Sequence, residues 1–292
     1  MKKLRFLLVG PGRLGTSLAA AWVGAGHVCA GVRGGTAPAR ARAWRLMRRR
    51  APRAGGRPPA FDLLLIAVPD REVSRVARSW AKRGSWEGRF ALHTSGVLRA
   101  SVLAPLRAQG ASVGALHPLV SIPFPDPGPG LFRGIYFGVE GDPEASRWAR
   151  RLARDAGGRS LEIRATGKAR YHLGACLASG YLLALLDAAA SRIAAGSADP
   201  ALLRRAFLAL AESTLRNARA RGIEAALTGP ILREDVVSVR AHGQALARLP
   251  AVWRALYRGL AAHTLDLAAR SGRIRPSSAR RIRRVLEVEE TE

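Results

Sequence analysis

The chain has 292 residues, 48% of them hydrophobic, and its 48 Lys and Arg residues outnumber 21 Asp and Glu residues to give a formal net charge of +27. This length allows two domains that each bury a core, and no continuous apolar run reaches the roughly 18 residues that a membrane span needs. The excess charge is almost all arginine spread along the chain, so we expect no specific nucleic-acid partner. Adhesion to polyanions at low salt remains an alternative.

The remaining composition indicates a reduced, metal-free protein. The two cysteines, Cys29 and Cys176, stand in apolar contexts without metal-ligand spacing around them. The first residues are typical of a strand and not of a cleavable signal. We therefore expect a cytoplasmic protein that does not attach to a membrane.

The N-terminal residues predict a strand, a glycine-rich turn and a helix. An apolar run at residues 4–9 leads into Gly10-Pro11-Gly12-Arg13-Leu14-Gly15, and an Ala-rich helical stretch follows at 14–25. In such a turn Gly10 permits the sharp bend, Gly12 lets the backbone approach a pyrophosphate, and Gly15 allows close packing of helix and strand. The N–H groups at the start of the helix would face the phosphates. This arrangement favours a bound dinucleotide over a turn without a ligand.

The rest of the first half alternates strand and helix signals, which indicates a doubly wound parallel sheet with helices on both faces. The expected elements are strands at 27–32, 62–68, 89–93, 113–117, 135–139 and 161–163, helices at 37–50 and 73–82, a Pro/Gly/Arg loop through 59, and a Pro-rich connection over 118–130.

Helical periodicity replaces the strand signal after about residue 165. The expected helices lie at 168–195, 199–220, 235–249, 251–269 and 277–285. The predicted fold is α/β, with a dinucleotide-binding domain at 1–164, an all-helical domain for substrate binding and dimerisation at 165–286, and an acidic tail at 287–292. We expect the ligand cleft between the two domains.

The end of the second strand predicts which nucleotide binds. NAD-binding domains place an acidic residue there for the ribose hydroxyls, whereas this chain has Arg33, followed by Arg40 and Arg42. A guanidinium attracts the 2′-phosphate of NADP through charge-assisted hydrogen bonds worth roughly 1.5–3 kcal/mol. We therefore predict NADP(H), while Arg33 as one arginine among many remains the alternative.

Polar motifs follow three of the predicted strands, where ligands of an open parallel sheet bind. They are Ala67-Val68-Pro69-Asp70, His93-Thr94-Ser95-Gly96 and His117-Pro118-Leu119. Ser95 and His117 are the preferred candidates, because a hydroxyl and an imidazole beside a nicotinamide could bind or protonate a carbonyl. Asp70 is equally explained as a helix cap, and His93 as a histidine satisfied at the end of its strand. Val68 and Pro69 are expected to border the cofactor.

The helical domain supplies further candidates. Lys168 and His172 share one helical face, and the Lys168 ammonium could stabilise the negative charge that develops on a reduced carbonyl. The alternative is a lysine exposed to water at a helix start. Candidates for substrate contact are Ser179, Asn217, Thr228 and Arg233, the last of which could grip a carboxylate with two parallel bonds. Each of these is also explained as a cap or a helix-packing group.

The order of the motifs resembles that of a known family. Gly-Pro-Gly-Arg-Leu-Gly, Ala-Val-Pro-Asp, His-Thr-Ser-Gly, His-Pro-Leu, Tyr171-His172, Thr-Leu-Arg-Asn and Leu-Thr-Gly-Pro are similar to Rossmann-like proteins whose C-terminal domain is the domain of unknown function type 2520. The wider relatives that this implies are the 6-phosphogluconate dehydrogenase-like reductases, including pyrroline-5-carboxylate reductase, ketopantoate reductase and prephenate dehydrogenase.

The resemblance also implies roles for single residues. Ser95 and His117 match groups that act on the substrate hydroxyl in prephenate dehydrogenases. Lys168 matches the lysine of a Lys-x-x-x-Asn pair in ketopantoate reductases, although His172 stands where asparagine would be. Gly180 likewise replaces an asparagine that usually follows the serine. These departures leave the substrate and the proton donor undetermined.

Together these features predict an NADPH-dependent reductase of a small carbonyl or imine that carries a carboxylate, such as a 2-oxo acid, acting as a homodimer. A dinucleotide-binding sensor or scaffold without catalytic activity is the alternative. A polyanion-binding protein is the third reading, with support only from the arginine excess.

Overall fold

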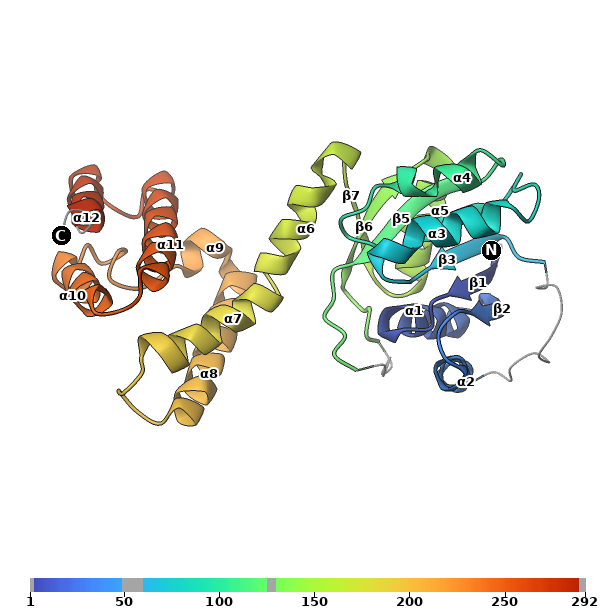
Figure 1. Ribbon diagram of the computed structural model, residues 1–292. Coiled ribbons are helices and arrows are strands. Elements are labelled where there is room, and N and C mark those ends of the chain that lie inside the picture. The colour runs from blue at the N-terminus through green and yellow to red at the C-terminus, as the bar shows by residue number, and fades with distance from the viewer. Residues whose placement is uncertain (1–2, 49–59, 125–129, 289–292) are drawn as a thin grey trace. The chain divides into compact units, whose positions relative to one another are not determined.

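The computed structural model describes residues 3–48, 60–124 and 130–288, and the chain forms two compact units, Met1–Ser179 and Gly180–Glu292 (Figure 1). The first unit extends beyond the expected boundary after residue 164 and includes the helix that begins at Lys168. The end of the predicted loop through 59, the middle of the Pro-rich connection and the last four residues lie outside the described residues.

A seven-stranded sheet organises the first unit, in the order β2-β1-β3-β4-β5-β6-β7. Its strands are β1 (Arg5–Val9), β2 (Val28–Arg33), β3 (Leu63–Ile66), β4 (Phe90–His93), β5 (Ser112–Pro118), β6 (Tyr136–Gly141) and β7 (Arg159–Glu162). Neighbouring strands are parallel except β5 and β6, which run antiparallel. The doubly wound fold is confirmed, but the expectation of a fully parallel sheet was wrong at β6.

Helices cover both faces of this sheet (Figure 1). These helices are α1 (Arg13–Gly24), α2 (Ala37–Leu46), α3 (Asp70–Ala81), η1 (Ala100–Leu103), α4 (Ala104–Arg107) and α5 (Pro143–Asp155). After β7 the chain continues into η2 (Ala165–Gly167) and α6 (Lys168–Leu177). Sequence patterns did not predict η1, α4 or α5. The predicted helix at 37–50 ends earlier, because α2 stops at Leu46.

Two apolar clusters lie on the two faces and hold the helices in place. One joins α1, α2 and α5 to the sheet through Trp22, Trp44 and Trp148, and the other joins α3 and α4 to it through Trp80 and Leu106. Burying a large apolar side chain of this kind stabilises a fold by roughly 1.5–3 kcal/mol. The carboxyl ends of the strands are thereby fixed on a rigid, well-packed platform.

The second unit is helical throughout its described residues, as predicted. It comprises α7 (Gly180–Ala188), the π-helical turn η3 (Ala189–Ile193), α8 (Pro200–Arg221), α9 (Ile223–Ala226), α10 (Val236–Ala247), α11 (Ala251–Arg270) and α12 (Pro276–Val288). Its core is a single apolar cluster that includes Val239, Leu265 and Ile282. The expected continuous helix at 168–195 is interrupted at residues 178 and 179.

One stretch contradicts the expectation that no segment is long enough to span a membrane. The helical residues Ala165–Ile193 number 29, their most apolar window has a mean hydropathy of 1.6, and only 11% of that window is buried. Length and composition alone therefore allow a membrane span here. Alanine and glycine alternate with leucine in this stretch, so it contains no continuous run of large apolar side chains.

Candidate functional site

The glycine turn after β1 has the geometry that its three glycines predict. Gly10 has φ +97°, and a side chain on it would overlap the Ala67 carbonyl; its N–H donates to the Arg33 carbonyl at 3.0 Å. A side chain at Gly15 would overlap the Gly10 carbonyl. Gly12 differs, because a Cβ there would meet no atom within 4 Å. Internal packing therefore requires Gly10 and Gly15, whereas the missing side chain of Gly12 leaves room for a ligand.

The start of α1 offers hydrogen-bond donors beside this space. Gly12 precedes the helix and provides no side-chain cap, so the first N–H groups, at Arg13 and Leu14, face outward without a capping side chain. The Arg13 guanidinium donates to the Pro123 carbonyl at 2.8 Å. Val68 and Pro69 follow β3 on the other side of the turn, where Val68 Cγ1 lies next to Gly10. The structure thus brings together all the predicted cofactor residues of this loop.

The loop after β2 carries positive charge and no carboxylate. Arg33 ends the strand, with its Nη1 donating to the Val32 carbonyl at 3.1 Å. Arg40 Nη1 donates to the carbonyls of Gly34 and Gly35 at 3.3 and 2.7 Å, and Thr36 caps α2. No Asp or Glu occurs between Val28 and Leu46. The guanidinium groups of Arg33 and Arg40 therefore both contact the backbone at this end of β2.

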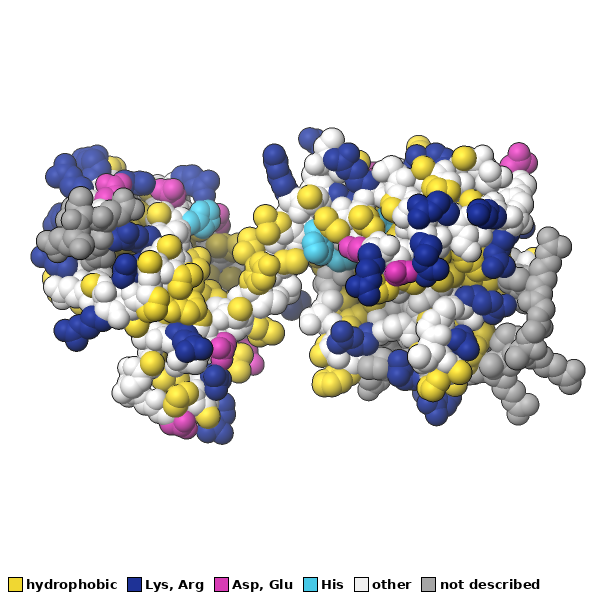
Figure 2. All heavy atoms as spheres, viewed as in Figure 1, with side chains coloured by type: hydrophobic (Ala, Val, Ile, Leu, Met, Phe, Trp, Pro, Cys, Tyr) yellow, Lys and Arg dark blue, Asp and Glu magenta, His cyan; other side chains and the backbone are white. Residues whose placement is uncertain are grey.

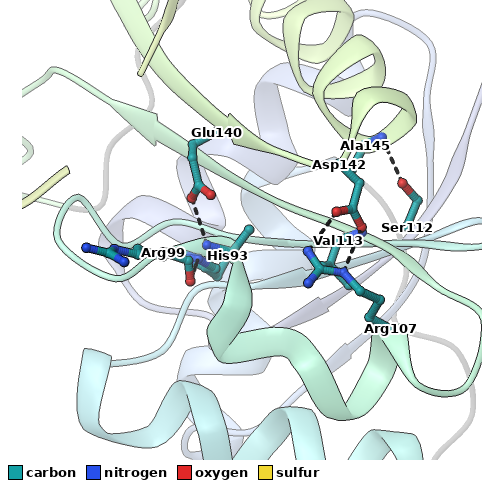
Figure 3. Close-up of polar contacts among 9 residues, drawn as sticks. His93, Arg99, Arg107, Ser112, Val113, Glu140, Asp142 and Ala145 are labelled. Atoms are coloured by element: carbon teal, nitrogen blue, oxygen red, sulfur yellow. Dashed lines mark hydrogen bonds and ion pairs between the residues drawn. The ribbon is translucent and has the colours of Figure 1, made fainter. Parts of the chain in front are cut away.

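His93 at the end of β4 is a structural group. Its Nδ1 accepts a hydrogen bond from the Ser95 N–H at 3.2 Å. The ring hydrogen therefore lies on Nε2, which donates to the carbonyl of Arg99 at 3.3 Å; Figure 3 shows His93 beside Arg99. Burial lowers the pKa of His93 to about 3, so the ring is neutral at physiological pH. His93 therefore shapes the turn that carries Ser95, which agrees with the structural alternative.

Ser95 is buried with a defined hydrogen-bond role. Its Oγ accepts from the N–H groups of Val97 and Leu98 at 3.2 and 3.0 Å. Both bonds use the oxygen lone pairs, so the hydroxyl hydrogen remains available to an acceptor outside this turn. Ser95 can therefore donate a hydrogen bond to a ligand at the strand ends.

Lys168 begins α6 and is buried, which excludes the alternative of a lysine exposed to water. Its side chain is 2% exposed, and Nζ lies 3.5 Å from Oε2 of Glu140. Among the described residues, no group accepts a hydrogen bond from this Nζ. Burial lowers the pKa of Lys168 to about 8, an effect that Glu140 partly opposes. The ammonium therefore keeps unused donors in a protected setting.

His117, Tyr171 and His172 form a cluster beside this lysine. His117 Nδ1 lies 2.9 Å from the Tyr171 hydroxyl, and the two rings meet edge to face with centroids 5.6 Å apart. The His172 ring centroid is 5.9 Å from that of His117. Burial lowers the pKa of His117 to about 4 and raises that of Tyr171 to about 12. At neutral pH the phenol can donate to Nδ1, which places the imidazole hydrogen on Nε2.

Two glycines make this cluster possible. A side chain at Gly96 would overlap the His172 ring and lie 2.9 Å from His117, and one at Gly138 would overlap the Tyr171 hydroxyl. Sequence patterns did not identify these glycines, Tyr171 as a partner of His117, or Glu140. The available signal for Glu140 was a carboxylate at the end of the apolar run of β6. The predicted catalytic residues Ser95, His117, Lys168 and His172 do lie in one unit. His117 and His172 lie against Gly96, and Lys168 lies against Glu140.

Of the predicted substrate-binding residues, only Ser179 belongs to the unit that holds this cluster. Ser179 is exposed at the end of the first unit and donates to the Ala175 carbonyl at 2.7 Å. Asn217 is an exposed residue of α8, and Thr228 and Arg233 are exposed between α9 and α10. Those three belong to the second unit, and their contact with substrate stays a prediction.

Two family models match the chain. Residues 1–118 match the Rossmann-like domain, and residues 135–264 match the domain of unknown function DUF2520. These matches confirm the resemblance drawn from the motifs. No match was found among curated proteins.

Solved structures share the fold at low sequence identity. A Bacteroides fragilis protein with a provisional assignment as an NADP oxidoreductase has a TM-score of 0.67 and 20% identity, covering 90% of this chain and 98% of its own. An imine reductase from Aspergillus terreus in complex with NADPH4 has a TM-score of 0.61 and 19% identity, covering 96% and 99%. A pyrroline-5-carboxylate reductase from Coxiella burnetii has a TM-score of 0.57 and 10% identity, covering 99% and 98%.

Proposed function

We propose that this protein, which consists of a Rossmann-like domain followed by a DUF2520 domain, is an NADPH-dependent reductase of a small carbonyl or imine substrate. The observation that carries the proposal is the buried Lys168 ammonium, whose donors are unused among the described residues, in the unit that also holds the open glycine turn. Similarity in fold to an imine reductase in complex with NADPH4 supports it.

The residues present fit a dinucleotide phosphate. The open space at Gly12 and the first N–H groups of α1 would hold the pyrophosphate, and Arg33 and Arg40 would hold the 2′-phosphate. When bound, NADPH supplies the hydride. The chain's own task is then to orient the substrate and to manage charge and protons at its reacting heteroatom.

Lys168 is suited to that task. Its Nζ would donate a hydrogen bond to the carbonyl oxygen or imine nitrogen and oppose the negative charge that develops there. Because burial lowers its pKa to about 8, Lys168 can also give up a proton near neutral pH. The Ser95 hydroxyl and His117 Nε2–H would supply further donors. The first substrate class to examine is the 2-oxo acids, whose carbonyl oxygen would accept from these donors.

We also propose that the protein acts as a homodimer through its helical unit. None of the 22 residues of α8 is buried, although the helix carries several leucines that are about half exposed or more. A second copy would remove this apolar surface from water.

The test is NADPH oxidation with a panel of 2-oxo acids, including ketopantoate, and cyclic imines. We expect turnover with at least one compound and a preference for NADPH over NADH. Lys168→Met should lower kcat by about 100- to 1000-fold, as expected for loss of one preplaced donor. Lys82→Met, which changes an exposed lysine after α3, should keep full activity. Binding of NADPH without oxidation across the panel would instead identify a dinucleotide sensor.

A further inference from the structure

Glu140 lies near the end of β6, where contacts with β5 and η1 hold it in place. It pairs in register with Ala115 of β5, and its side chain is 10% exposed. Its Oε2 accepts a hydrogen bond from the Ala100 N–H at 2.7 Å, at the start of η1 (Figure 3). This backbone donor holds the carboxylate in place.

The same oxygen faces the Lys168 ammonium at 3.5 Å. This separation gives electrostatic attraction, while the donors of Nζ remain free to point elsewhere, because no described group accepts from them. An isolated ammonium at 2% exposure would favour its neutral form, since burial penalises charge. Glu140 therefore offsets the cost of keeping this nitrogen charged.

Other ionisable groups around Lys168 do not replace Glu140. The carboxylate of Asp70 on α3 attracts the ammonium more weakly than Glu140 does. His93 on β4 and His117 on β5 also face the lysine, but burial lowers the pKa of both rings, and they are neutral at physiological pH. The negative charge nearest to Lys168 thus comes from Glu140.

We infer that Glu140 is a positioning residue of the proposed reductase. It holds the Lys168 ammonium in place and keeps it charged, so that the Nζ donors can bind the substrate heteroatom. The catalytic meaning of this inference rests on the proposed function. The electrostatic pairing concerns only two side chains of this protein and can be measured without substrate or cofactor.

The direct test is carbon NMR of protein labelled at the lysine Cε. The chain has four lysines, and the Lys168 signal is identified by its loss in Lys168→Met. In Glu140→Gln the amide oxygen can still accept from Ala100, but the negative charge is gone. We expect the proton-binding constant of Lys168 to fall by about tenfold or more. Glu162→Gln removes an exposed carboxylate that pairs with Arg150 on the surface, and it should leave Lys168 unchanged.

Glu140→Asp is a second variant, which keeps the carboxylate but shortens the side chain by one carbon. It should lower the proton-binding constant less than Glu140→Gln does. An unchanged Lys168 titration in both folded variants would overturn the inference.

With a substrate from the panel, the loss of activity at high pH should move to lower pH in Glu140→Gln. A protein that oxidises no NADPH would defeat the proposed function, while the NMR titration would still decide the pairing.

Discussion

The two units differ in where their apolar side chains lie. In the first unit Trp22 and Leu65 are fully buried on the faces of the sheet. In the second unit α8 has no buried residue, and Leu210 and Leu215 are 63% and 56% exposed. Figure 2 shows hydrophobic side chains at the surface of the helices, whereas Lys and Arg are spread over both units. The first unit therefore has a complete core, while the helical unit leaves apolar surface exposed to water.

The units also differ in how they hold their charges. The first unit buries Lys168 and His93 and half-buries His117, so protonation of the two histidines is costly. The second unit pairs its charges near the surface, as in the bonds between Glu234 and Arg275. These bonds lower the pKa of Glu234 to about 2. The two units should therefore respond to acid at different pH values.

The largest expected effect is loss of stability of the first unit on mild acidification. The pKa values of His93 and His117, about 3 and 4, lie below the ordinary value of 6.5. The unfolded chain therefore binds protons first as pH falls, and stability that is complete above pH 6.5 declines toward pH 4. Between pH 7 and pH 5 the two rings together should lower the free energy of unfolding of the first unit by roughly 4 kcal/mol.

The second unit should keep its stability between pH 7 and pH 5. The stabilisation from Glu234 is present above its ordinary pKa of 4.5 and is lost only as pH falls toward 2. Urea unfolding at pH 7 and pH 5, read by pulsed amide exchange for peptides of each unit, measures the difference. Equal loss in both units, or a larger loss in the second, would show that the buried histidines do not govern acid stability.

A smaller effect is expected at the exposed face of α8. Leu210→Asp places a charge where we propose that a second copy packs, and it should weaken self-association by about 100-fold. Sedimentation equilibrium should show a dimer for the wild type and a monomer for the variant at micromolar concentration. Glu212→Gln, a polar change on the same helix, serves as the control. A wild-type monomer would mean that the apolar surface has another occupant or none.

Much of the first unit could be predicted because its strands are short apolar runs that end in glycine or polar residues. The helix α5 was missed although Ala145, Trp148, Ala149 and Leu152 have helical spacing and are buried. Its many arginines obscure the apolar face of the helix in the sequence. The direction of β6 was also missed, because it depends on the connection from β5, whose described residues contain no crossover helix.

The candidate site was predictable only in part. Ser95, His117 and Lys168 carry recognisable chemistry and stand at strand ends or a helix start. Glu140 pairs with a lysine that is distant in sequence, and Tyr171 meets His117 across a similar distance. Such pairs arise only when the sheet and α6 pack together, so local patterns contain no information about them.

The most direct test of the account is NADPH binding to two glycine variants of α1 and its preceding turn. A side chain would meet nothing within 4 Å at either Gly12 or Gly24, so both Gly12→Ala and Gly24→Ala should fold with nearly wild-type thermal stability. Calorimetric titration should show at least about tenfold weaker NADPH binding for Gly12→Ala, because its methyl group occupies space for the pyrophosphate. Gly24→Ala should bind like the wild type. Equal NADPH affinity in all three proteins would contradict the placement of the dinucleotide on this turn.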